Sequence, residues 1–435
     1  MSKLLNDNSR CNVKGLFSVS PMLFFILLFI FIFLLTGNIY KISLSVVFTI
    51  SSVYALYTLK NRSITERIKV FSRGAGQENL MLMLWIFVLA GAFAQTAKDI
   101  GAIDAVVRVA LHFLPSHLIL AGLFVTACFV SLSIGTSVGT VAALVPIATG
   151  IATSTGQPTA MLVAAVVGGA FFGDNLSFIS DTTIASTKTQ GCELKDKFKA
   201  NFLIVLPAAM ITVIIYIFTN SQSQYSTEIT AIDYIKMLPY IIILVSAICG
   251  MNVFVVLAVG NLLSGITGMA LGVCNMEDWF VSAGNGIMSM GELIIISMLA
   301  GGMLEVIREN GGIEYIINKL SSHIHSKRGG ELIIGAMVGI TNLCTANNTI
   351  AILSVGKIAK SISTRFGINP CKAASILDTF SCVVQGLIPY GAQFLIASGL
   401  SHVQPTNILP YIYYPVIVGI TAIIGIIIRY PKKYS

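Results

Sequence analysis

The sequence predicts an all-α polytopic membrane protein, with about 11 to 12 transmembrane segments in two inverted-topology repeats that contain discontinuous helices. Charged residues make up 11% of the chain and hydrophobic residues 55%, whereas soluble domains are roughly a quarter charged. Apolar runs such as residues 21–35, 202–218 and 408–428 suit helices that cross or half-cross a bilayer. The third observation is an internal repeat.

The repeat can be seen directly in the sequence. Ala90-Gly91 returns as Ala300-Gly301, and Lys98-Asp99 returns as Arg308-Glu309, both 210 positions later. A duplicated unit in an apolar chain is typical of transporter folds.

The charges of equivalent loops indicate that the second copy is upside down. Basic residues crowd the loop at 61–79, whereas its counterpart at 272–290 carries two acidic residues and no Lys or Arg. The basic segment 188–199 has a nearly uncharged counterpart at 400–407. Since basic loops stay in the cytoplasm, we expect the two copies to have opposite orientations. One basic loop would then fall on the outer side, and it carries Lys357, Lys360, Arg365 and Lys372.

We expect five regions along the chain. These are a cytoplasmic N-terminus with the first membrane helix at 1–39, a first repeat at 40–200, linking helices at 201–250, a second repeat at 251–407, and a last membrane helix with a cytoplasmic tail at 408–435. The positive-inside rule explains the net charge of +8, so the charge does not indicate nucleic-acid binding.

Two segments of the first repeat interrupt their helices with polar residues. Residues 131–140 read SLSIGTSVGT, where Thr136 and Ser137 lie between glycines. Residues 168–183 read GGAFFGDNLSFISDTT. Broken helices occur at membrane depth only where the backbone lines a cavity or is buried in protein. The alternative for the first segment is hydroxyl and glycine helix packing.

The second segment places two carboxylates, Asp174 and Asp181, among hydroxyls between apolar flanks. Carboxylates at membrane depth persist where they face each other, water or a cation. Residues seven apart lie two turns apart on a continuous helix, so these two share a site only if the helix unwinds between them. A helix-capping turn before the basic stretch 188–199 is the alternative interpretation.

The second repeat shows the same design with different side chains. Thr345, Asn347 and Asn348 mark one break, and residues 377–390 mark the other. Asp378 aligns with Asp174 at an offset of 204, which places Gln385 opposite Asp181. We therefore expect an asymmetric ion site. Packing or hydrogen bonding between helices could also explain the amides.

These motifs resemble the NhaC-type Na⁺/H⁺ antiporter family of the ion transporter superfamily. Residues 168–183 resemble the family pattern G-D-x-x-S-x-x-S-D-T-T, and the resemblance extends over GTSVGTVAALVPIA at 135–148, LDTFSCVVQGLIPYG at 377–391 and most of the chain. The sequence departs from the family at Asn175, Phe178, Asp378 and Tyr390, where Lys, Pro, Glu and Trp are frequent.

The resemblance implies a secondary active transporter that exchanges Na⁺ for H⁺ by alternating access. Asp174, Asp181 and Asp378 would bind Na⁺ or H⁺ in turn, and Thr136, Ser137, Ser177 and Thr182 would complete the oxygen shell. Of these, Asp174, Asp181 and Ser177 would ligate the Na⁺ most directly. The alternative is a Na⁺- or H⁺-coupled exchanger or symporter of a small organic acid, of malate or lactate type, or of an amino acid. In that case Asn175, Thr345, Asn347, Asn348 and Gln385 would bind the substrate.

The expected setting is a bacterial inner membrane, with both termini in the cytoplasm. The expected partners are the lipid bilayer, Na⁺, H⁺ and, in the alternative, a small carboxylate or amino acid. A homodimer is left open. A membrane enzyme that uses Asp174 and Asp181 as an acid–base pair is disfavoured, because no nucleophile, metal cluster or phosphate-binding loop accompanies them. We expect no cofactor.

Overall fold

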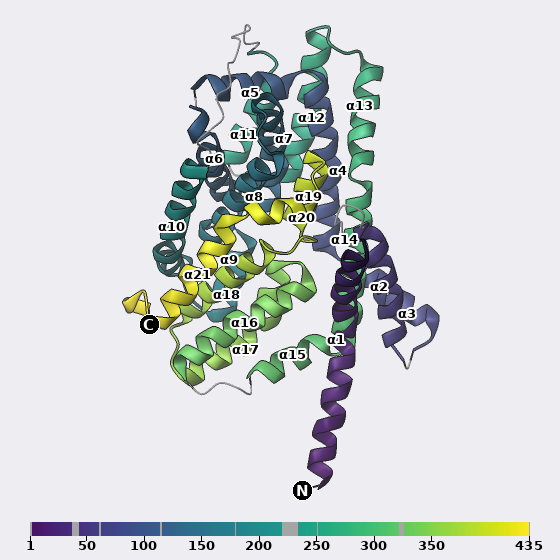
Figure 1. Ribbon diagram of the computed structural model, residues 1–435, viewed down its shortest axis with the longest axis vertical. Coiled ribbons are helices and arrows are strands. Elements are labelled where there is room, and N and C mark those ends of the chain that lie inside the picture. Colours follow the sequence, from purple (N-terminus) through teal and green to yellow (C-terminus); the bar gives the residue numbers. More distant parts are fainter. Residues whose placement is uncertain are drawn as a thin grey trace.

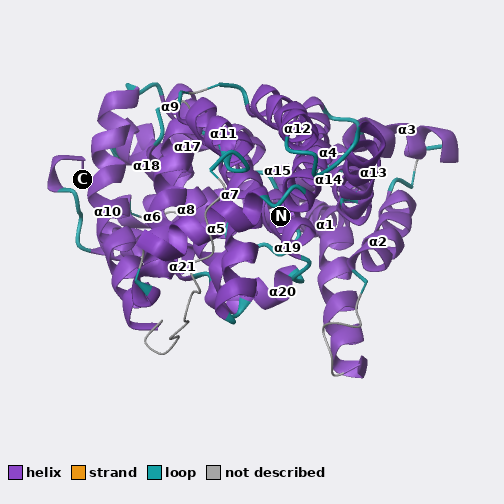
Figure 2. Cartoon of the chain, turned by 90° about the horizontal axis from the view of Figure 1, so that it is seen from above, coloured by secondary structure: helices purple, strands orange, loops and turns teal. Residues whose placement is uncertain are grey.

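The structure is a computed structural model. It describes residues 2–36, 43–60, 62–113, 115–178, 180–219, 234–249, 251–321 and 326–434. These residues form helices, turns and coil, without a strand. Figure 2 shows α2, α3, α13 and α14 on one side of the molecule, and α9, α10, α17 and α18 on the other. The all-α prediction is confirmed.

The helices follow one another in two similar series. The first series is α1 (Ser2–Thr36), α2 (Leu44–Thr58), α3 (Ile64–Ala75), α4 (Glu78–Asp99), α5 (Ala102–Phe113), α6 (Ile119–Ile134), α7 (Ser137–Thr155), α8 (Thr159–Leu176), α9 (Asp181–Gln190) and α10 (Leu194–Thr219). The second is α11 (Leu238–Ile248), α12 (Val253–Ala270), α13 (Met276–Ser289), α14 (Gly291–Glu309), α15 (Gly312–Ser321), α16 (Lys327–Thr345), α17 (Asn348–Phe366), α18 (Pro370–Gln385), α19 (Ala392–Ser401), the short α20 (Pro405–Ile408) and α21 (Tyr413–Ile427). The C-terminal turn is η4 (Lys432–Tyr434).

Equivalent helices begin with similar local chemistry. A capping box starts α3, where the Ser63 side chain accepts from the Glu66 backbone N–H and the Glu66 carboxylate accepts from the Ser63 N–H. Asn275 and Asp278 form the same reciprocal pair at the start of α13. Such boxes satisfy N–H groups that the helix leaves without an internal partner.

The packing shows that the two series are related by an approximate two-fold axis. Helix α4 packs against α13, and reciprocally α14 packs against α3; α9 packs against α17, and α19 against α7. In Figure 1, α5 and α7 lie toward the top of the long axis and their counterparts α15 and α17 toward the bottom. The two series therefore run in opposite orientations, as the inverted repeats of transporters do.

In each series one pair of helices forms a hairpin with its tip inside the protein. The α6–α7 hairpin turns at Gly135, and the α16–α17 hairpin turns at Ala346, both in left-handed backbone conformation (φ 74° and 46°). A left-handed alanine is uncommon and is held only by its surroundings. Lys327 at the start of α16 and Gly367 just after α17 line one cavity, so both ends of that hairpin lie at the same end of the molecule.

This hairpin corrects the predicted side of one basic loop. The segment with Lys357, Lys360, Arg365 and Lys372 was expected on the side opposite to residues 188–199. Instead the Gln190 side chain of α9 donates to the Gly356 carbonyl of α17 over 2.9 Å. The loop lies on this side because α17 returns to the end from which α16 enters, so the two helices form a hairpin and not two crossings. We call the end that carries Lys188, Lys327, Lys360 and Lys433 the basic pole.

Several of the helices are too short to cross a membrane alone. By length and composition, six of the described helices are long and apolar enough to span, or up to seven if the bent pair of Pro405–Tyr411 and Tyr413–Ile427 counts as one span. Four further apolar helices have 10 to 17 residues. The predicted number of about 11 to 12 segments thus includes half-spanning helices that meet at breaks.

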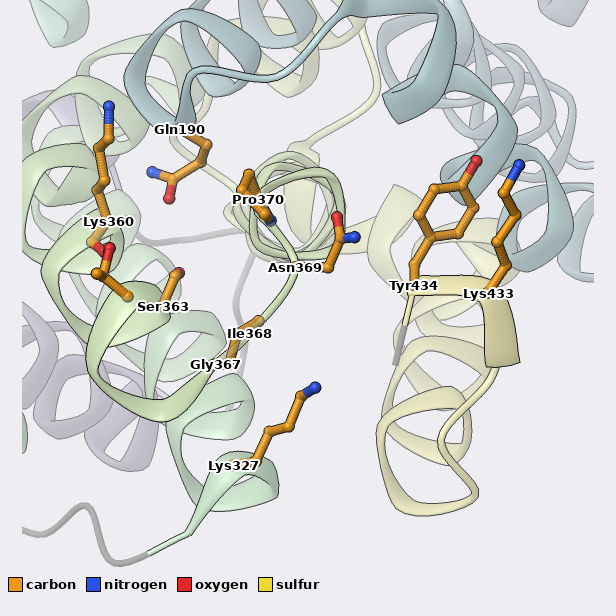
Figure 3. Close-up of a pocket in the computed structure, with 11 residues that line it drawn as sticks. Gln190, Lys327, Lys360, Ser363, Gly367, Ile368, Asn369, Pro370, Lys433 and Tyr434 are labelled. Atoms are coloured by element: carbon orange, nitrogen blue, oxygen red, sulfur yellow. The ribbon is translucent and has the colours of Figure 1, made fainter.

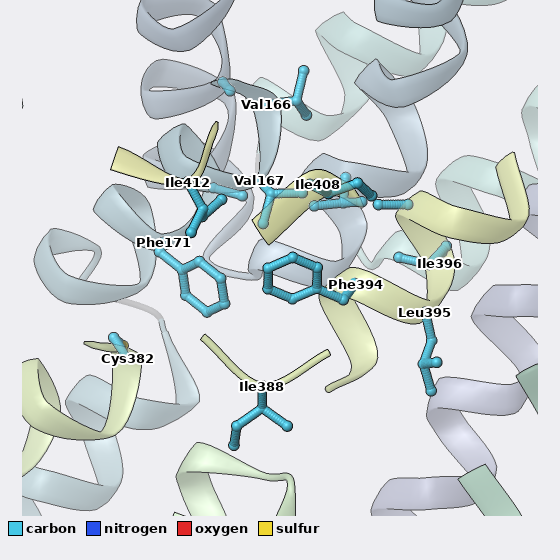
Figure 4. Packing of buried hydrophobic residues seen from close by; sticks show 14 of the residues in the cluster. Val166, Val167, Phe171, Cys382, Ile388, Phe394, Leu395, Ile396, Ile408 and Ile412 are labelled. Carbon is cyan, nitrogen blue, oxygen red and sulfur yellow. The ribbon is translucent and has the colours of Figure 1, made fainter. Parts of the chain in front are cut away.

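An apolar core surrounds these breaks. Figure 4 shows Phe171 of α8, Phe394 of α19 and Ile388, from the break between α18 and α19, in one buried cluster. Close packing of this kind leaves little room for water. Any ion that reaches the broken helices must therefore follow polar side chains.

Candidate ion-binding site

Equivalent hydrogen bonds tie each hairpin to the interrupted helix beside it. The Ser131 hydroxyl donates to the Ala170 carbonyl over 2.6 Å, and the Asn342 amide donates to the Ser381 carbonyl over 2.7 Å. Both residues of the second pair lie 211 positions after those of the first. In this register Asp174 corresponds to Gln385, which corrects the predicted alignment of Asp174 with Asp378. The sequence alignment matched two Asp-x-x-Ser motifs that occupy different turns of α8 and α18.

Asp174 lies in the last turn of α8, with only 4% of its surface exposed. One carboxylate oxygen accepts the Ser137 backbone N–H over 3.0 Å, and the other accepts the Ser137 hydroxyl. Ser137 is the first residue of α7, so the carboxylate caps the N-terminus of that helix. The partial positive charge of a helix N-terminus favours an anion there.

A chain of side chains leads from Asp174 to the other hairpin. Gln393 of α19 donates to the Ser137 hydroxyl over 2.8 Å, and it accepts from Gln385 over 3.1 Å. Gln385 also donates to the carbonyl of Ala346 over 2.9 Å. This chain links both hairpin tips with both interrupted helices. Gln393 could not be selected from the sequence, because it lies outside the polar motifs.

The second buried carboxylate, Asp378 in α18, forms an ion pair with Lys197 of α10. The Lys197 ammonium also donates to the carbonyl of Asn175 over 2.8 Å and to the Thr183 hydroxyl over 2.7 Å. Asn201, one turn along α10, donates to Asp378 over 3.1 Å. Asp378 is therefore charge-compensated inside the protein.

Lys197 is the main residue that the sequence prediction missed, since it was grouped with the basic loop 188–199. A signal was available in the helical spacing. Lys197 and Asn201 are four residues apart and continue into Ile204, Val205 and Ala208, all buried on α10. A stripe at this spacing indicates one buried helix face.

The structure confirms the break between Asp174 and Asp181 but separates their environments. Helix α8 ends at Leu176 and α9 begins at Asp181. Asp181 is exposed, so the expectation that both carboxylates are buried in one site is wrong for Asp181. As the first residue of α9, it turns outward while Thr182 and Thr183 turn inward.

The predicted hydroxyl ligands are distributed around the break. Thr182 donates to the backbone carbonyl of Asp174 over 3.1 Å, and Ser177 donates to the Leu132 carbonyl over 2.9 Å. The Thr136 carbonyl accepts from Thr140 over 3.0 Å. The Ser137 side chain contacts the Asp174 carboxylate directly.

The predicted substrate-binding residues mostly serve the backbone. Asn347 caps α17 by accepting the Ile350 N–H over 3.0 Å, and Thr345 donates to the Asn347 carbonyl over 3.0 Å. Asn348 donates to the Cys382 sulfur over 3.8 Å. Asn175 donates to the carbonyl of Phe171 over 3.0 Å.

Three amide side chains at the breaks keep a buried oxygen without a hydrogen-bond partner. They are Asn175 (Oδ1), Asn342 (Oδ1) and Gln385 (Oε1). In each, the amide nitrogen donates to a backbone carbonyl, which fixes the orientation of the oxygen. Buried orphan acceptors are rare, and they suit a ligand that is a cation or a hydrogen-bond donor. Within the described residues, no group of three or more His, Cys, Asp or Glu side chains could hold a metal ion.

The chain is similar in sequence to known Na⁺/H⁺ antiporters. The model of the Na⁺/H⁺ antiporter family matches residues 12–221 and 223–428. The Na⁺/H⁺ antiporter NhaC of Bacillus subtilis is 25% identical over 398 residues, covering 82% of this chain and 85% of that protein. The NhaC antiporter of Alkalihalophilus pseudofirmus is 26% identical over 292 residues, covering 59% and 62%. The malate-2H⁺/Na⁺-lactate antiporter of Bacillus subtilis is 18% identical over 385 residues, covering 80% and 82%.

Proposed function

The chain belongs to the Na⁺/H⁺ antiporter family, and from this premise we propose that Asp174 is the carboxylate that binds Na⁺ and H⁺ in turn. The protein is a multi-pass membrane protein and a secondary antiporter, not an enzyme. Its cargo is the Na⁺ and H⁺ of the family. The proposal concerns which residues bind these two ions.

The observation that supports Asp174 is the different compensation of the two buried carboxylates. Lys197 neutralises Asp378, whereas Asp174 forms no ion pair within the described part of the chain. An uncompensated buried carboxylate is costly, so it takes up a proton or a cation. Either a proton or Na⁺ can neutralise the Asp174 carboxylate, and the carboxylate cannot bind both at once.

The groups around Asp174 can stabilise both its protonated form and its Na⁺-bound form. The Ser137 N–H and hydroxyl both donate to the Asp174 carboxylate, and such donors favour its charged form, the form that binds Na⁺. The orphan oxygens of Asn175 and Gln385 offer neutral ligands of the hard type that Na⁺ prefers. In this proposal the Ser137 hydroxyl turns its lone pairs toward the cation when Na⁺ replaces the proton.

Exchange follows from alternating access to this single site. The two hairpins enter from opposite ends of the molecule, so movement of one bundle against the other would open Asp174 to each side in turn. We place the basic pole in the cytoplasm, following the positive-inside rule, and the protein in a bacterial inner membrane. Asp181, which is exposed at the start of α9, would attract Na⁺ toward the break.

The chemistry of the site disfavours an organic acid or amino acid as the main substrate. A carboxylate substrate needs several free donors or an unpaired cation, but Lys197 is already paired with Asp378, and the amide oxygens without a partner at the breaks are acceptors. The alternative of malate, lactate or amino-acid exchange therefore has less support.

Sealed proteoliposomes test this function. An imposed Na⁺ gradient should drive proton flux without any organic solute, and added malate, lactate or amino acids should leave the rate unchanged. Proton flux that required one of these solutes would instead establish the alternative exchanger.

A further inference from the structure

A cavity at the basic pole is lined by none of the residues proposed to bind the ion. Its volume is about 490 Å³, and it lies between α9, α16, α17, the start of α18 and the C-terminal turn η4. Figure 3 shows its side chains arranged around the N-terminus of α18. The proposed exchange does not use this cavity.

The walls of the cavity are positively charged. Lys327 of α16, Lys360 of α17 and Lys433 of η4 line it, together with hydroxyl groups of α17, and no acidic residue does. None of these three lysines forms an ion pair with any residue that the structure describes. Figure 3 shows Lys360 and Lys433 on opposite sides of the α18 N-terminus, with Lys327 below it, so positive charge surrounds this space and attracts an anion.

The N-terminus of α18 adds a further attraction for an anion. Asn369 caps this 16-residue helix by accepting the Cys371 N–H over 2.8 Å, and Pro370 follows at its first position. Both residues line the cavity. The helix macrodipole therefore places partial positive charge at the cavity wall.

A buried side chain without a partner supplies independent evidence of a ligand. Gln190 is only 2% exposed and lines the cavity. Its amide nitrogen donates to Gly356 over 2.9 Å, which directs the oxygen elsewhere, and that oxygen has no hydrogen-bond partner. In Figure 3 the Gln190 oxygen points away from the ribbon of α9 into the space beside Ser363. The missing partner must be a hydrogen-bond donor.

We propose that this cavity binds a phosphate group that carries at least one O–H donor. The lysines and the α18 N-terminus would hold the phosphate oxygens, and Gln190 would accept the hydroxyl hydrogen. Hydrogen phosphate, a soluble phosphate ester and the phosphoglycerol headgroup of a lipid share this chemistry. The ligand would join α9, α17 and α18, whose other ends form the breaks around Asp174, and so stabilise one arrangement of the transporter.

The first test compares phosphate with sulfate on the purified full-length protein. Near neutral pH phosphate keeps an O–H group, whereas sulfate has none, so only phosphate can donate to Gln190. Phosphate should raise the melting temperature at lower concentration than sulfate does at equal ionic strength. Gln190→Leu should remove this preference. Equal stabilisation of the wild-type protein by both anions would overturn the role of Gln190.

Two matched charge variants test the lysines without reference to transport. Lys360→Gln with Lys433→Gln should weaken phosphate binding by about tenfold or more, since each change removes a charge-assisted hydrogen bond. Lys357→Gln with Lys432→Gln removes the same charge at exposed neighbours outside the cavity and should change binding less than about twofold. An equal loss of phosphate affinity in the two double variants would contradict a specific phosphate site in this cavity.

A third comparison distinguishes a soluble phosphate ester from a lipid headgroup as the ligand. Glycerol phosphate and a short-chain phosphatidylglycerol are titrated in parallel against the wild-type protein. Tighter binding of the lipid would identify a headgroup site, and equal or tighter binding of glycerol phosphate would identify a soluble ligand. Failure of phosphate and of both of these ligands to stabilise the protein would overturn the proposal, whatever the outcome of the Na⁺/H⁺ assays.

Discussion

Lys197 and Asp378, which are 181 positions apart, form an ion pair with side chains only 1% and 0% exposed. The pair joins α10 of the first series to α18 of the second. In our proposal this pairing leaves Asp174, and not Asp378, as the carboxylate that takes the cargo cation. The contrast with the unpaired Asp174 is the basis of the assignment made above.

Breaking this ion pair should destabilise the protein. Lys197→Met leaves a buried charge on Asp378, which costs about 3–5 kcal/mol when a buried pair loses one member. Adding Asp378→Asn should recover most of that loss. Thermal unfolding in detergent measures both effects. Lys199→Met, at an exposed position on the same helix, is the control, and a Lys197→Met protein as stable as this control would disprove the structural role.

The Na⁺ affinity should depend on pH in a defined direction. Na⁺ binds the deprotonated carboxylate of Asp174, so protons compete with it as the pH falls. The half-saturating Na⁺ concentration should rise by about tenfold per pH unit once the proton occupies the site. Exchange rates in proteoliposomes over a series of pH values measure this. An affinity that stays constant, or that improves toward acid pH, is incompatible with a shared site.

The contact between Gln393 and Ser137 should tune the site. Gln393→Leu removes the donor that orients the Ser137 hydroxyl, and we expect a loss of about tenfold in Na⁺ affinity, the effect of one charge-linked hydrogen bond. Ser133→Ala, which removes a hydroxyl bound only to the Phe129 carbonyl of its own helix, should behave as wild type. Sodium titrations measure the Na⁺ affinity of both variants. Equal affinities would show that Gln393 does not contribute to the site.

Glycines set the close approach of α4 and α13. A Cβ atom added at Gly91 would lie 2.4 Å from the Gly286 carbonyl oxygen, so Gly91→Ala should destabilise by about 1–3 kcal/mol. Gly284→Ala, on the same α13, meets nothing within 4 Å and should stabilise the helix by up to about 1 kcal/mol. Thermal unfolding compares them. The same melting temperature for both would contradict the close approach.

Much of the fold could be predicted from the sequence, because apolar runs, repeated letters and loop charges each report directly on a membrane protein. The breaks at Gly135 and after Asp174 were predicted for the same reason, since polar and glycine-rich segments cannot continue a lipid-exposed helix. The side of the 357–372 loop was not, because length alone does not distinguish a crossing from a hairpin.

The site was predicted less completely than the fold. Asp174 and Ser137 were found from local motifs, and the structure brings them into contact. Lys197 and Gln393 lie far from those motifs in the sequence, so only the packing of α10 and α19 reveals them. The exposure of Asp181 depends on how α9 rotates after the break, which residue spacing does not determine.

The most direct test of the central claim is sodium exchange by Asp174→Asn in proteoliposomes that contain equal amounts of folded protein. Asparagine keeps the shape but cannot carry the charge, so radioactive sodium uptake driven by an outward proton gradient should fall to the level of empty vesicles. Asp181→Asn should retain measurable uptake in the same assay. Wild-type uptake by Asp174→Asn would show that Asp174 is not the carboxylate that exchanges Na⁺ for H⁺.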